Sequence, residues 1–481
     1  MKIGCIVSLA MLAFCLCPPG PCDTHYVSPE GSDEAPYLSP ETAARSIQSA
    51  VDVASPGDTV SVGPGNYRGT IVMGPGLKLV GSGADQTRIW GGITAGIDSE
   101  IRAVAVTQDW GGDDPDYQPV AITGPRMGSM VIADCRISGT FEEGIQCRSE
   151  GGFTAILDCE IRAEAPRDSM LGISIWSWAG QLCLIDRCRL QGAGVQMGSH
   201  ANELWVTRTT FSGLGSGLSV QSGEARLVAC AFDRCSTALG IEGNTRVIVE
   251  STALTRSEES GLWCGDDAQV ELHNCTITRN AYGISLNYSE IEACSCIIWG
   301  NAEDVRVQVP EPYCRLEVTY SDVGNVPPGT LCWENIDTDP LFRDSQAGDF
   351  RLRPDSPCID AGLEGASHLY KAHDLDGMGR VAYGGKEDHH RVDMGAYEYY
   401  INRLCAGPVP GQLTLTWSSW QRRTYSIFYS EDLLTWRLAE EAFAAGPGPL
   451  VLTTSWTDDG SLTGLAPSLA PRRFYRLLEN P

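Results

Sequence analysis

Aromatic, amide, imidazole and carboxyl side chains recur at intervals in the middle of the chain, and this combination could bind a sugar. Rings stack on apolar sugar faces, and polar groups bind hydroxyls. A histidine beside carboxylates could also act as a general acid or base. The candidate ligand-binding residues are Trp176, Trp178, Asn244 and Tyr288, and the weak catalytic candidates are His200, Asp266 and Asp267. The alternative is that they are solvated turn residues with two surface tryptophans.

A second set of carboxylates could hold calcium. Asp374-Leu-Asp376-Gly377 resembles the start of a calcium loop, with two carboxylates two residues apart and a glycine for the turn. The third acidic residue and the closing glutamate of an EF-hand are missing, so Asp388, Asp393 or Glu398 would have to complete the site through folding. The alternative is a tight turn in which an aspartate contacts Arg380. Calcium is thus a candidate cofactor, and none is certain.

The 19 cysteines offer two further kinds of chemistry. The repeat cysteines lie in a strand column where isoleucine or threonine stands in neighbouring repeats, so we expect Cys135, Cys159, Cys230 and Cys275 to be buried thiols that pack as small hydrophobes. Disulfides are possible in an exported chain, and Cys314 with Cys332, or Cys294 with a neighbour, are the better candidates. No C-x-x-C pair exists, which argues against a thiolate zinc site.

The elements that must position these residues form a repeat of about 22 residues. One column contains Cys135, Cys159, Cys188, Thr209, Cys230, Thr252, Cys275 and Cys296. A second pairs a small residue with an aliphatic one at Gly144-Ile145, Gly172-Ile173, Gly194-Val195, Gly217-Leu218, Ala238-Leu239, Gly261-Leu262 and Gly283-Ile284. Apolar residues alternate with period two inside each repeat, which is typical of strands. We therefore predict a parallel β-solenoid in which both columns form inward-facing stacks, with room for roughly twelve coils.

The turns after the second column carry the candidate ligand residues, so these should share one edge of the rod. A sugar site there requires Trp176, Trp178, His200 and Asp266 to face one groove.

The chain resembles the right-handed parallel β-helix proteins of the pectin-lyase-like group. The opening His25-Tyr-Val-Ser-Pro-Glu-Gly-Ser-Asp33 and Gly63-Pro-Gly-Asn-Tyr67 are similar to the N-terminal cap and first coil of exported bacterial members. Ser356-Pro-Cys-Ile-Asp-Ala-Gly362 and Asp393-Met-Gly-Ala-Tyr-Glu398 resemble the closing segment of the choice-of-anchor Q family. The resemblance implies export and a β-helix, without a settled activity.

The pectin-degrading members of this group use catalytic sets that are incomplete here. Gly265-Asp266-Asp267 looks like the aspartate pair of polygalacturonases, but the Gly-His-Gly and Arg-x-Lys partners of that family are absent. No lysine lies in the coils between Arg88 and Val323, which disfavours a lysine-based lyase. The function expected is a glycan-binding or cell-envelope module, and the alternative is a polysaccharide lyase, hydrolase or epimerase with an unfamiliar site.

The order of segments follows from these patterns. Residues 1–22 read as a signal peptide, because a positive start precedes an apolar run too short to span a bilayer. We expect an N-terminal cap at 23–58, with a helix that starts at Ser39-Pro40 and turns Ile47, Ala50, Val51 and Ala54 to one face. Coils follow at 59–325, the closing segment at 326–400 and a linker at 401–408. Residues 409–481 resemble a fibronectin type III-like sandwich whose core would contain Trp417, Tyr425 and Trp436.

Charge and composition limit the partners. With 61 acidic and 35 basic side chains the net charge is −26, which disfavours nucleic acid and anionic lipid. A neutral polysaccharide suits this charge better than an acidic one. We expect a secreted, periplasmic or surface-bound monomer without a membrane span. A lipoprotein is an open alternative, although Phe14 before Cys15 and Leu16 before Cys17 match a lipobox poorly.

Overall fold

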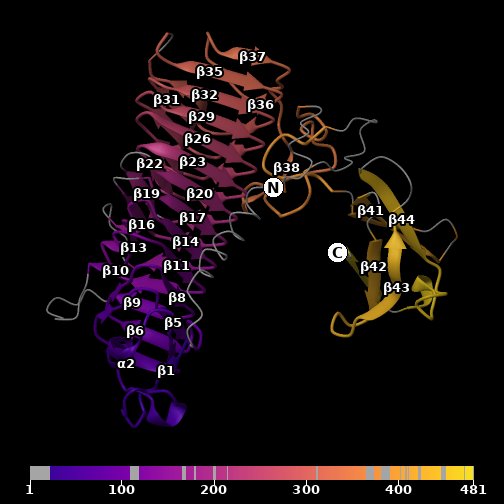
Figure 1. The fold of residues 1–481 in the computed structure, drawn as a ribbon. Coiled ribbons are helices and arrows are strands. Elements are labelled where there is room, and N and C mark those ends of the chain that lie inside the picture. The colour runs from indigo at the N-terminus through magenta and orange to yellow at the C-terminus, as the bar shows by residue number, and fades with distance from the viewer. Residues whose placement is uncertain are drawn as a thin grey trace.

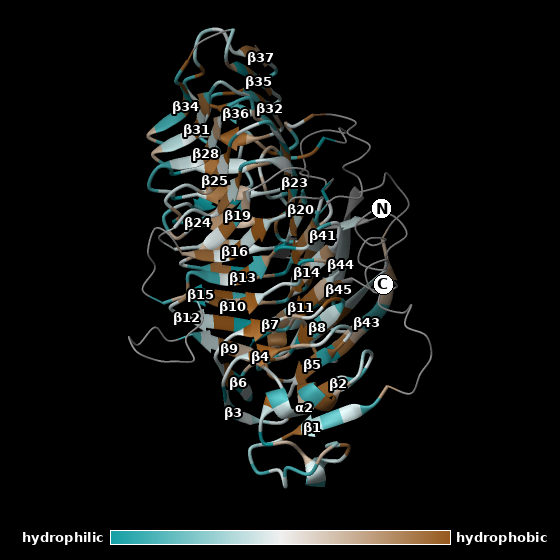
Figure 2. Cartoon of the chain, turned by 60° about the vertical axis from the view of Figure 1, so that its left-hand side comes forward, coloured by the Kyte–Doolittle hydropathy of each residue, from teal (hydrophilic) through white to brown (hydrophobic). Residues whose placement is uncertain are grey.

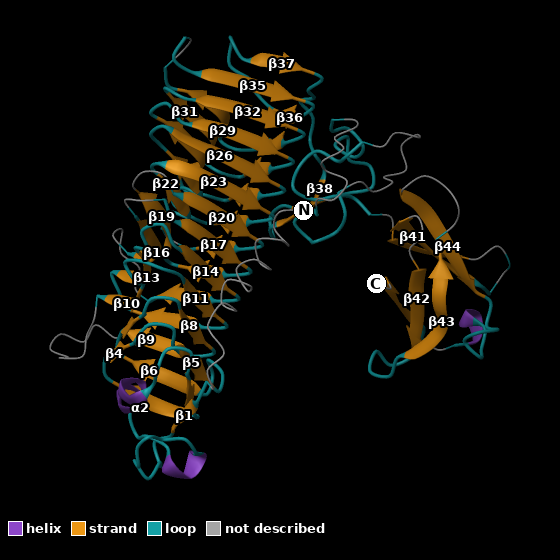
Figure 3. Cartoon of the chain, in the orientation of Figure 1, coloured by secondary structure: helices purple, strands orange, loops and turns teal. Residues whose placement is uncertain are grey.

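The computed structural model shows an all-β chain in which a parallel β-solenoid of about 11 turns, with about 22 residues per turn, is followed by small antiparallel sheets (Figure 1). It describes residues 22–108, 119–164, 170–177, 180–198, 202–213, 215–309, 312–363, 373–380, 391–400, 402–406, 409, 411–420, 424–445, 451–470 and 472–479. Strands and loops make up nearly all of this (Figure 3).

Each turn of the solenoid gives one strand to each of three parallel sheets, which we name sheets A, B and C in the order in which a turn visits them. Sheet A consists of β1 (Thr24–Val27), β2 (Thr59–Val62), β5 (Lys78–Gly81), β8 (Ser99–Arg102), β11 (Met130–Ala133), β14 (Phe153–Leu157), β17 (Leu182–Asp186), β20 (Glu203–Thr207), β23 (Gly223–Val228), β26 (Thr245–Glu250), β29 (Gln269–His273), β32 (Glu290–Cys294), β35 (Arg315–Thr319) and β37 (Leu331–Trp333).

Sheet B consists of β3 (Gly65–Arg68), β6 (Thr87–Trp90), β9 (Ala105–Gln108), β12 (Arg136–Gly139), β15 (Glu160–Ala163), β18 (Arg189–Gln191), β21 (Thr210–Ser212), β24 (Ala231–Asp233), β27 (Ala253–Thr255), β30 (Thr276–Thr278), β33 (Ile297–Ile298) and β36 (Asp322–Val323). Sheet C consists of β4 (Ile71–Val72), β7 (Ile93–Thr94), β10 (Val120–Thr123), β13 (Glu143–Cys147), β16 (Leu171–Trp176), β19 (Gly194–Gly198), β22 (Leu218–Val220), β25 (Leu239–Ile241), β28 (Ser260–Gly265), β31 (Tyr282–Asn287) and β34 (Glu303–Val307).

The predicted column of small–aliphatic pairs, from Gly144-Ile145 to Gly283-Ile284, is confirmed: its aliphatic residues are paired from turn to turn and point into the core. Its aliphatic residues lie opposite one another in sheet C, from the pair Ile145 and Ile173 to the pair Leu262 and Ile284, and all are buried. The small residue before each is needed because successive turns approach closely: a Cβ on Gly194 would lie 1.9 Å from the Ser216 carbonyl oxygen. Hydropathy alternates along these strands, as Figure 2 shows, because alternate side chains point into the core.

The predicted cysteine–threonine column, from Cys135 to Cys296, is also buried. It lies in the bend between sheets A and B rather than within a strand. The residue before each member has positive φ, as at Asp134 and Ser251, which turns the chain sharply. Each thiol or hydroxyl donates to the carbonyl oxygen two residues earlier, as Thr252 does to Glu250 at 2.9 Å. Thr252 Oγ1 also accepts from the Cys230 amide at 3.3 Å. Cysteine and threonine interchange here because both can donate and accept inside the bend.

The N-terminal cap is present, with its helix shorter than predicted. Ser39 caps only a 3₁₀ turn, η2 (Pro40–Thr42), and the α-helix α2 (Ile47–Val53) begins after its own cap, Ser46. Ile47, Ala50 and Val51 are buried against β1, β2 and β4.

Much of the described part of the predicted closing segment, 326–400, lies beside the later turns of the rod. A hairpin of β38 (Phe342–Asp344) and β39 (Asp349–Leu352) packs with Ile297 in one apolar cluster. Further on, Arg380 is fully buried, with 3.5 Å between its Nη1 and Glu398 Oε2, and it donates to Ser251 Oγ at 3.1 Å. The segment therefore docks along the A–B bend.

The C-terminal module has two three-stranded antiparallel sheets that share one core. The strands are β40 (Asn402–Ala406), β41 (Leu413–Trp420), β42 (Thr424–Ser430), β43 (Arg437–Ala444), β44 (Val451–Asp458) and β45 (Phe474–Glu479), with a 3₁₀ turn, η4 (Pro467–Leu469). Trp417 and Tyr425 are buried as predicted, but Trp456 completes the core rather than Trp436, which is only half-buried. The expected linker contributes β40, which pairs with β41.

The cysteines that were the better disulfide candidates are unpaired thiols. Cys314 is buried, Cys332 is exposed and Cys294 is half-buried.

Candidate functional site

The outer face of sheet C carries a continuous column of mostly polar side chains. Between the two inward residues of each strand stands one outward residue, and these pair in register from turn to turn. In order they are Gln146, Ser174, Gln196, Ser219, Gly240, Trp263, Ser285 and Arg306. Ser174 and Ser285 are buried, and the other six residues of the column are half-buried.

Two tryptophan rings lie close against this face because glycines make room for them. A Cβ on Gly198 would lie 2.3 Å from the ring of Trp176, and one on Gly265 would lie 2.7 Å from the ring of Trp263. Trp176 stays 41% exposed. The strands that carry the two tryptophans, β16 and β28, are four steps apart, which is about 19 Å along the rod at ~4.8 Å a step.

Gly240 stands between Ser219 and Trp263 and has open space above it. A Cβ there would meet nothing within 4 Å, and its φ is not in the left-handed region. It lies in a shallow pocket of about 260 Å³ lined by Ser216, Leu218, Ser219, Thr237, Gly240, Glu242, Glu259, Ser260 and Trp263. Gly240 therefore forms the base of the pocket, and the Trp263 ring forms one of its sides.

Hydrogen bonds fix the polar side chains around this pocket. Glu242 Oε1 accepts from Gln221 Nε2 at 2.6 Å, and Thr237 Oγ1 donates to Glu259 Oε2 at 3.3 Å. Gln196 Nε2 donates to Gln221 Oε1 at 3.4 Å. Amides, hydroxyls and carboxylates are therefore held where they can meet a polar ligand.

The predicted edge exists as the row of turns between sheets C and A, but it does not gather all the predicted residues. Asn244 lines an open groove of about 820 Å³ along these turns, together with Gln221 and Glu224. Tyr288 is exposed on the same edge, where its ring packs 5.5 Å from that of Tyr313. Neither Trp176 nor Tyr288 lines the groove, and Trp178 lies outside the described residues.

The weak catalytic candidates do not form a described constellation. Asp266 and Asp267 are exposed, with positive φ, and occupy the turn after β28. Their amides donate to the carbonyls of Asn287 and Tyr288 in the next turn. His200 lies outside the described residues.

The three calcium candidates each have protein donors around them. Asp374 accepts from the amides of Met378 and Glu398, and Asp376 makes two hydrogen bonds with Arg351. Asp393 accepts from two backbone amides, and burial raises its pKa to about 7. Among the described residues, no three His, Cys, Asp or Glu side chains are grouped as metal ligands would be. The calcium site stays a prediction.

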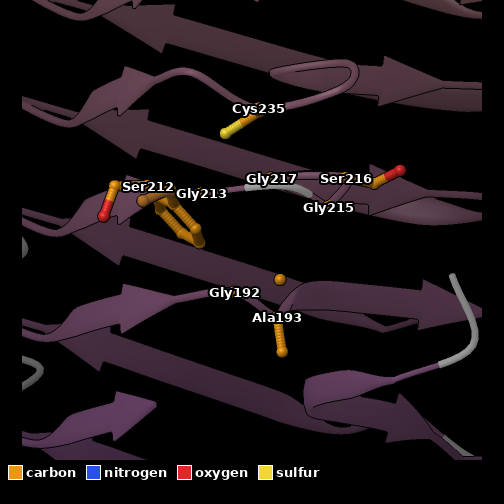
Figure 4. Close-up of a pocket in the computed structure, with 10 residues that line it drawn as sticks. Gly192, Ala193, Ser212, Gly213, Gly215, Ser216, Gly217 and Cys235 are labelled. Atoms are coloured by element: carbon orange, nitrogen blue, oxygen red, sulfur yellow. The ribbon is translucent and has the colours of Figure 1, made fainter. Parts of the chain in front are cut away.

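One small cavity is too small for a sugar. It lies between turns near Gly192, Gly213 and Cys235, as Figure 4 shows, and has a volume of about 10 Å³. That is about the space of one water molecule.

Sequence reasoning missed Trp263, Gly240, Glu242 and Glu259. Period-two alternation was the signal that could have found the first two, because the residue between Leu262 and Cys264 must point outward. The two glutamates lie in the loops that flank the strands, and only the coil register shows that they share a pocket.

Of the comparisons with known proteins, only the family match over residues 171–309 supports the architecture. No curated protein matches the sequence. Within the described residues no helix is long and apolar enough to cross a membrane.

Among solved structures, the Azotobacter vinelandii mannuronan C-5 epimerase AlgE6 A-module is 13% identical, with a TM-score of 0.40, over 61% of this chain and 94% of that one. The catalytic unit of the GH87 α-1,3-glucanase from Streptomyces thermodiastaticus strain HF3-3 is 13% identical, with a TM-score of 0.43, over 67% and 70%. A GH87 α-1,3-glucanase catalytic domain in complex with nigerose is 12% identical, with a TM-score of 0.37, over 64% and 60%. At these scores the likenesses do not bear on the function of this chain. Residues 171–309 match the family described as "Right handed beta helix region", and this part of the chain is a right-handed parallel β-helix.

Proposed function

We propose that this chain is an exported glycan-binding protein that holds a neutral polysaccharide along the outer face of sheet C. Export rests on the signal-like residues 1–22 and on the resemblance of residues 326–400 to the choice-of-anchor Q segment. The fibronectin type III-like module expected at 409–481 would be an accessory domain. A glycan lying along the rod would meet one strand about every 4.8 Å, so successive sugars would meet similar groups.

The observation that carries the proposal is Gly240. Glycine weakens a strand, and in strands it often marks a place where a ligand approaches closely. Crowding explains the glycines beneath Trp176 and Trp263, but nothing crowds Gly240. Its absent side chain leaves open the space beside the Trp263 ring, where a sugar could stack while Ser219 and Glu242 bind its hydroxyls.

The charge of the site favours a neutral chain. Glu242 and Glu259 both line the pocket, and the protein carries a net charge of −26. A polyuronate would be repelled by this field.

A direct test is to measure binding of neutral and acidic polysaccharides by affinity electrophoresis and calorimetry. Gly240→Leu should fill the pocket floor and weaken binding at least about tenfold. Its thermal stability should be unchanged or higher, because glycine weakens a strand and a Cβ at this position meets nothing within 4 Å. Ser138→Leu, on the outer face of sheet B, is the matched control. Wild-type binding by Gly240→Leu, or the absence of any bound glycan, would overturn the proposal.

The second candidate is a polysaccharide-modifying enzyme, because two carboxylates share the pocket with Trp263. Paired carboxyls can act as acid and base on a glycosidic bond. New reducing ends or ultraviolet-absorbing unsaturated products that disappear in Glu242→Gln and Glu259→Gln would favour catalysis. Binding with no product from any glycan would favour the first function.

A further inference from the structure

The two edge strands of sheet A differ in whether another backbone segment pairs with their outer side. At the N-terminal end, residues 37–44 run along β1 and close it: the Tyr26 amide donates to the Tyr37 carbonyl at 2.8 Å, and the Ala44 amide donates to the Tyr26 carbonyl at 2.9 Å. At the other end β37 is the last strand, and no described strand pairs with its outer edge (Figure 1).

The backbone groups on this outer edge belong to Cys332. The Trp333 carbonyl accepts from the Tyr320 amide of the preceding turn at 3.2 Å, so Trp333 and Leu331 direct their backbone groups towards β35. Backbone direction alternates along a strand, and the amide and carbonyl of Cys332 therefore face away from the rod.

Apart from its short length, β37 lacks the features that usually protect an edge. Natural edge strands carry charges, prolines or a cover. In sheet C the last strand, β34, contains Glu303, Asp304 and Arg306. β37 reads Leu331-Cys332-Trp333, with Leu331 44% and Trp333 50% exposed.

We propose that β37 pairs with β37 of a second copy of this chain, in an antiparallel, two-fold symmetric contact that joins two rods end to end. This goes beyond the glycan-binding function and replaces the expectation of a monomer. A dyad at Cys332 lets its amide donate to the Cys332 carbonyl of the second copy, and the reverse, because such a hydrogen-bonded pair needs both groups on the open edge.

The same register makes the exposed side chains complementary. With Cys332 opposite itself, Leu331 lies opposite Trp333 of the second copy, and Trp333 opposite Leu331, which are favourable cross-strand pairs. β37 itself contains no charged side chain, so this pairing places no like charges face to face. A strand from an unrelated protein would match these features only by chance, whereas a second copy matches them by symmetry.

The contact is tested with the full chain by light scattering after size exclusion, over a range of concentrations in reducing buffer. The wild type should approach twice the monomer mass. Trp333→Lys should raise the dissociation constant at least about tenfold, because it places a charge at the edge. Leu434→Lys, an exposed leucine of the C-terminal module, should leave the mass unchanged.

The register is tested by cross-linking. Cα atoms of a hydrogen-bonded pair lie about 5.5 Å apart, within reach of a disulfide. Copper–phenanthroline with oxygen takes two electrons and two protons from the two thiols, and the dimer should be linked through Cys332 alone. Cys332→Ser should abolish the link, and Cys294→Ser should not. A monomer at every concentration, a Trp333→Lys variant that dimerises like the wild type, or a link through another cysteine would overturn the proposal.

Discussion

Replacing Thr252 by valine tests whether the cysteine–threonine column at the A–B bend is a hydrogen-bonded ladder or only a stack of small side chains. Thr252 is fully buried. Its hydroxyl donates to the Glu250 carbonyl at 2.9 Å and accepts from the Cys230 amide at 3.3 Å. Valine keeps the shape and removes both interactions.

The expected magnitude follows from which groups lose a partner. The Glu250 carbonyl keeps the Ala229 amide at 3.0 Å, so its loss is partial. The Cys230 amide loses the hydroxyl acceptor within a buried bend. A buried donor left unsatisfied costs about 1–3 kcal/mol. Thr252→Val should lower the free energy of unfolding by this amount.

The control is Thr252→Cys, because a thiol makes the same contacts elsewhere in the column. The Cys275 amide donates to Cys296 Sγ at 3.5 Å, and Cys296 Sγ donates to the Cys294 carbonyl at 3.4 Å. This variant should lose less than about 1 kcal/mol.

Urea denaturation followed by circular dichroism measures both variants. With a slope of about 3 kcal/mol/M, the midpoint of Thr252→Val should fall by about 0.3–1 M. If the valine variant keeps the wild-type midpoint, or the cysteine variant falls as far, the column acts by packing alone and the ladder argument fails.

Three further outcomes are expected. Burial raises the pKa of Asp393 to about 7, so its contribution to stability is complete below about pH 4 and is lost as the pH rises through about 7. The melting temperature should therefore fall between about pH 4 and pH 7, and less so in Asp393→Asn. Gly194→Ala should destabilise the rod because its Cβ would overlap the Ser216 carbonyl, whereas Gly240→Ala, with open space, should be neutral or stabilising in the same melt. Arg380→Ala removes one partner of the buried Arg380–Glu398 ion pair and the hydrogen bond to Ser251, at a cost of about 3–5 kcal/mol. It should make the segment after Leu352 sensitive to limited proteolysis, and a variant as resistant as the wild type would contradict docking of this segment on the rod.

Local patterns were enough to predict the solenoid. A side chain in a stacked turn has the same surroundings as its counterpart one turn away, so recurring Gly–aliphatic pairs such as Gly261-Leu262 report the coil length directly. The structure confirms their register. The same periodicity predicted burial of the cysteine column, because a position occupied by Cys, Thr and nothing charged must face inward.

Tertiary structure decided the rest, wherever partners come from different turns or from outside the repeat. The hydrogen-bonding role of Thr252 depends on an amide 22 positions earlier, in Cys230, that stacking brings beneath it. Glu242 and Glu259 share a pocket only because two turns are in register. The docking of Arg380 on Ser251 joins segments 129 residues apart, and no local pattern specifies such a contact. The sequence shows which side chains repeat from turn to turn. The open space above Gly240 exists only in the stacked structure, because neighbouring turns form its boundaries.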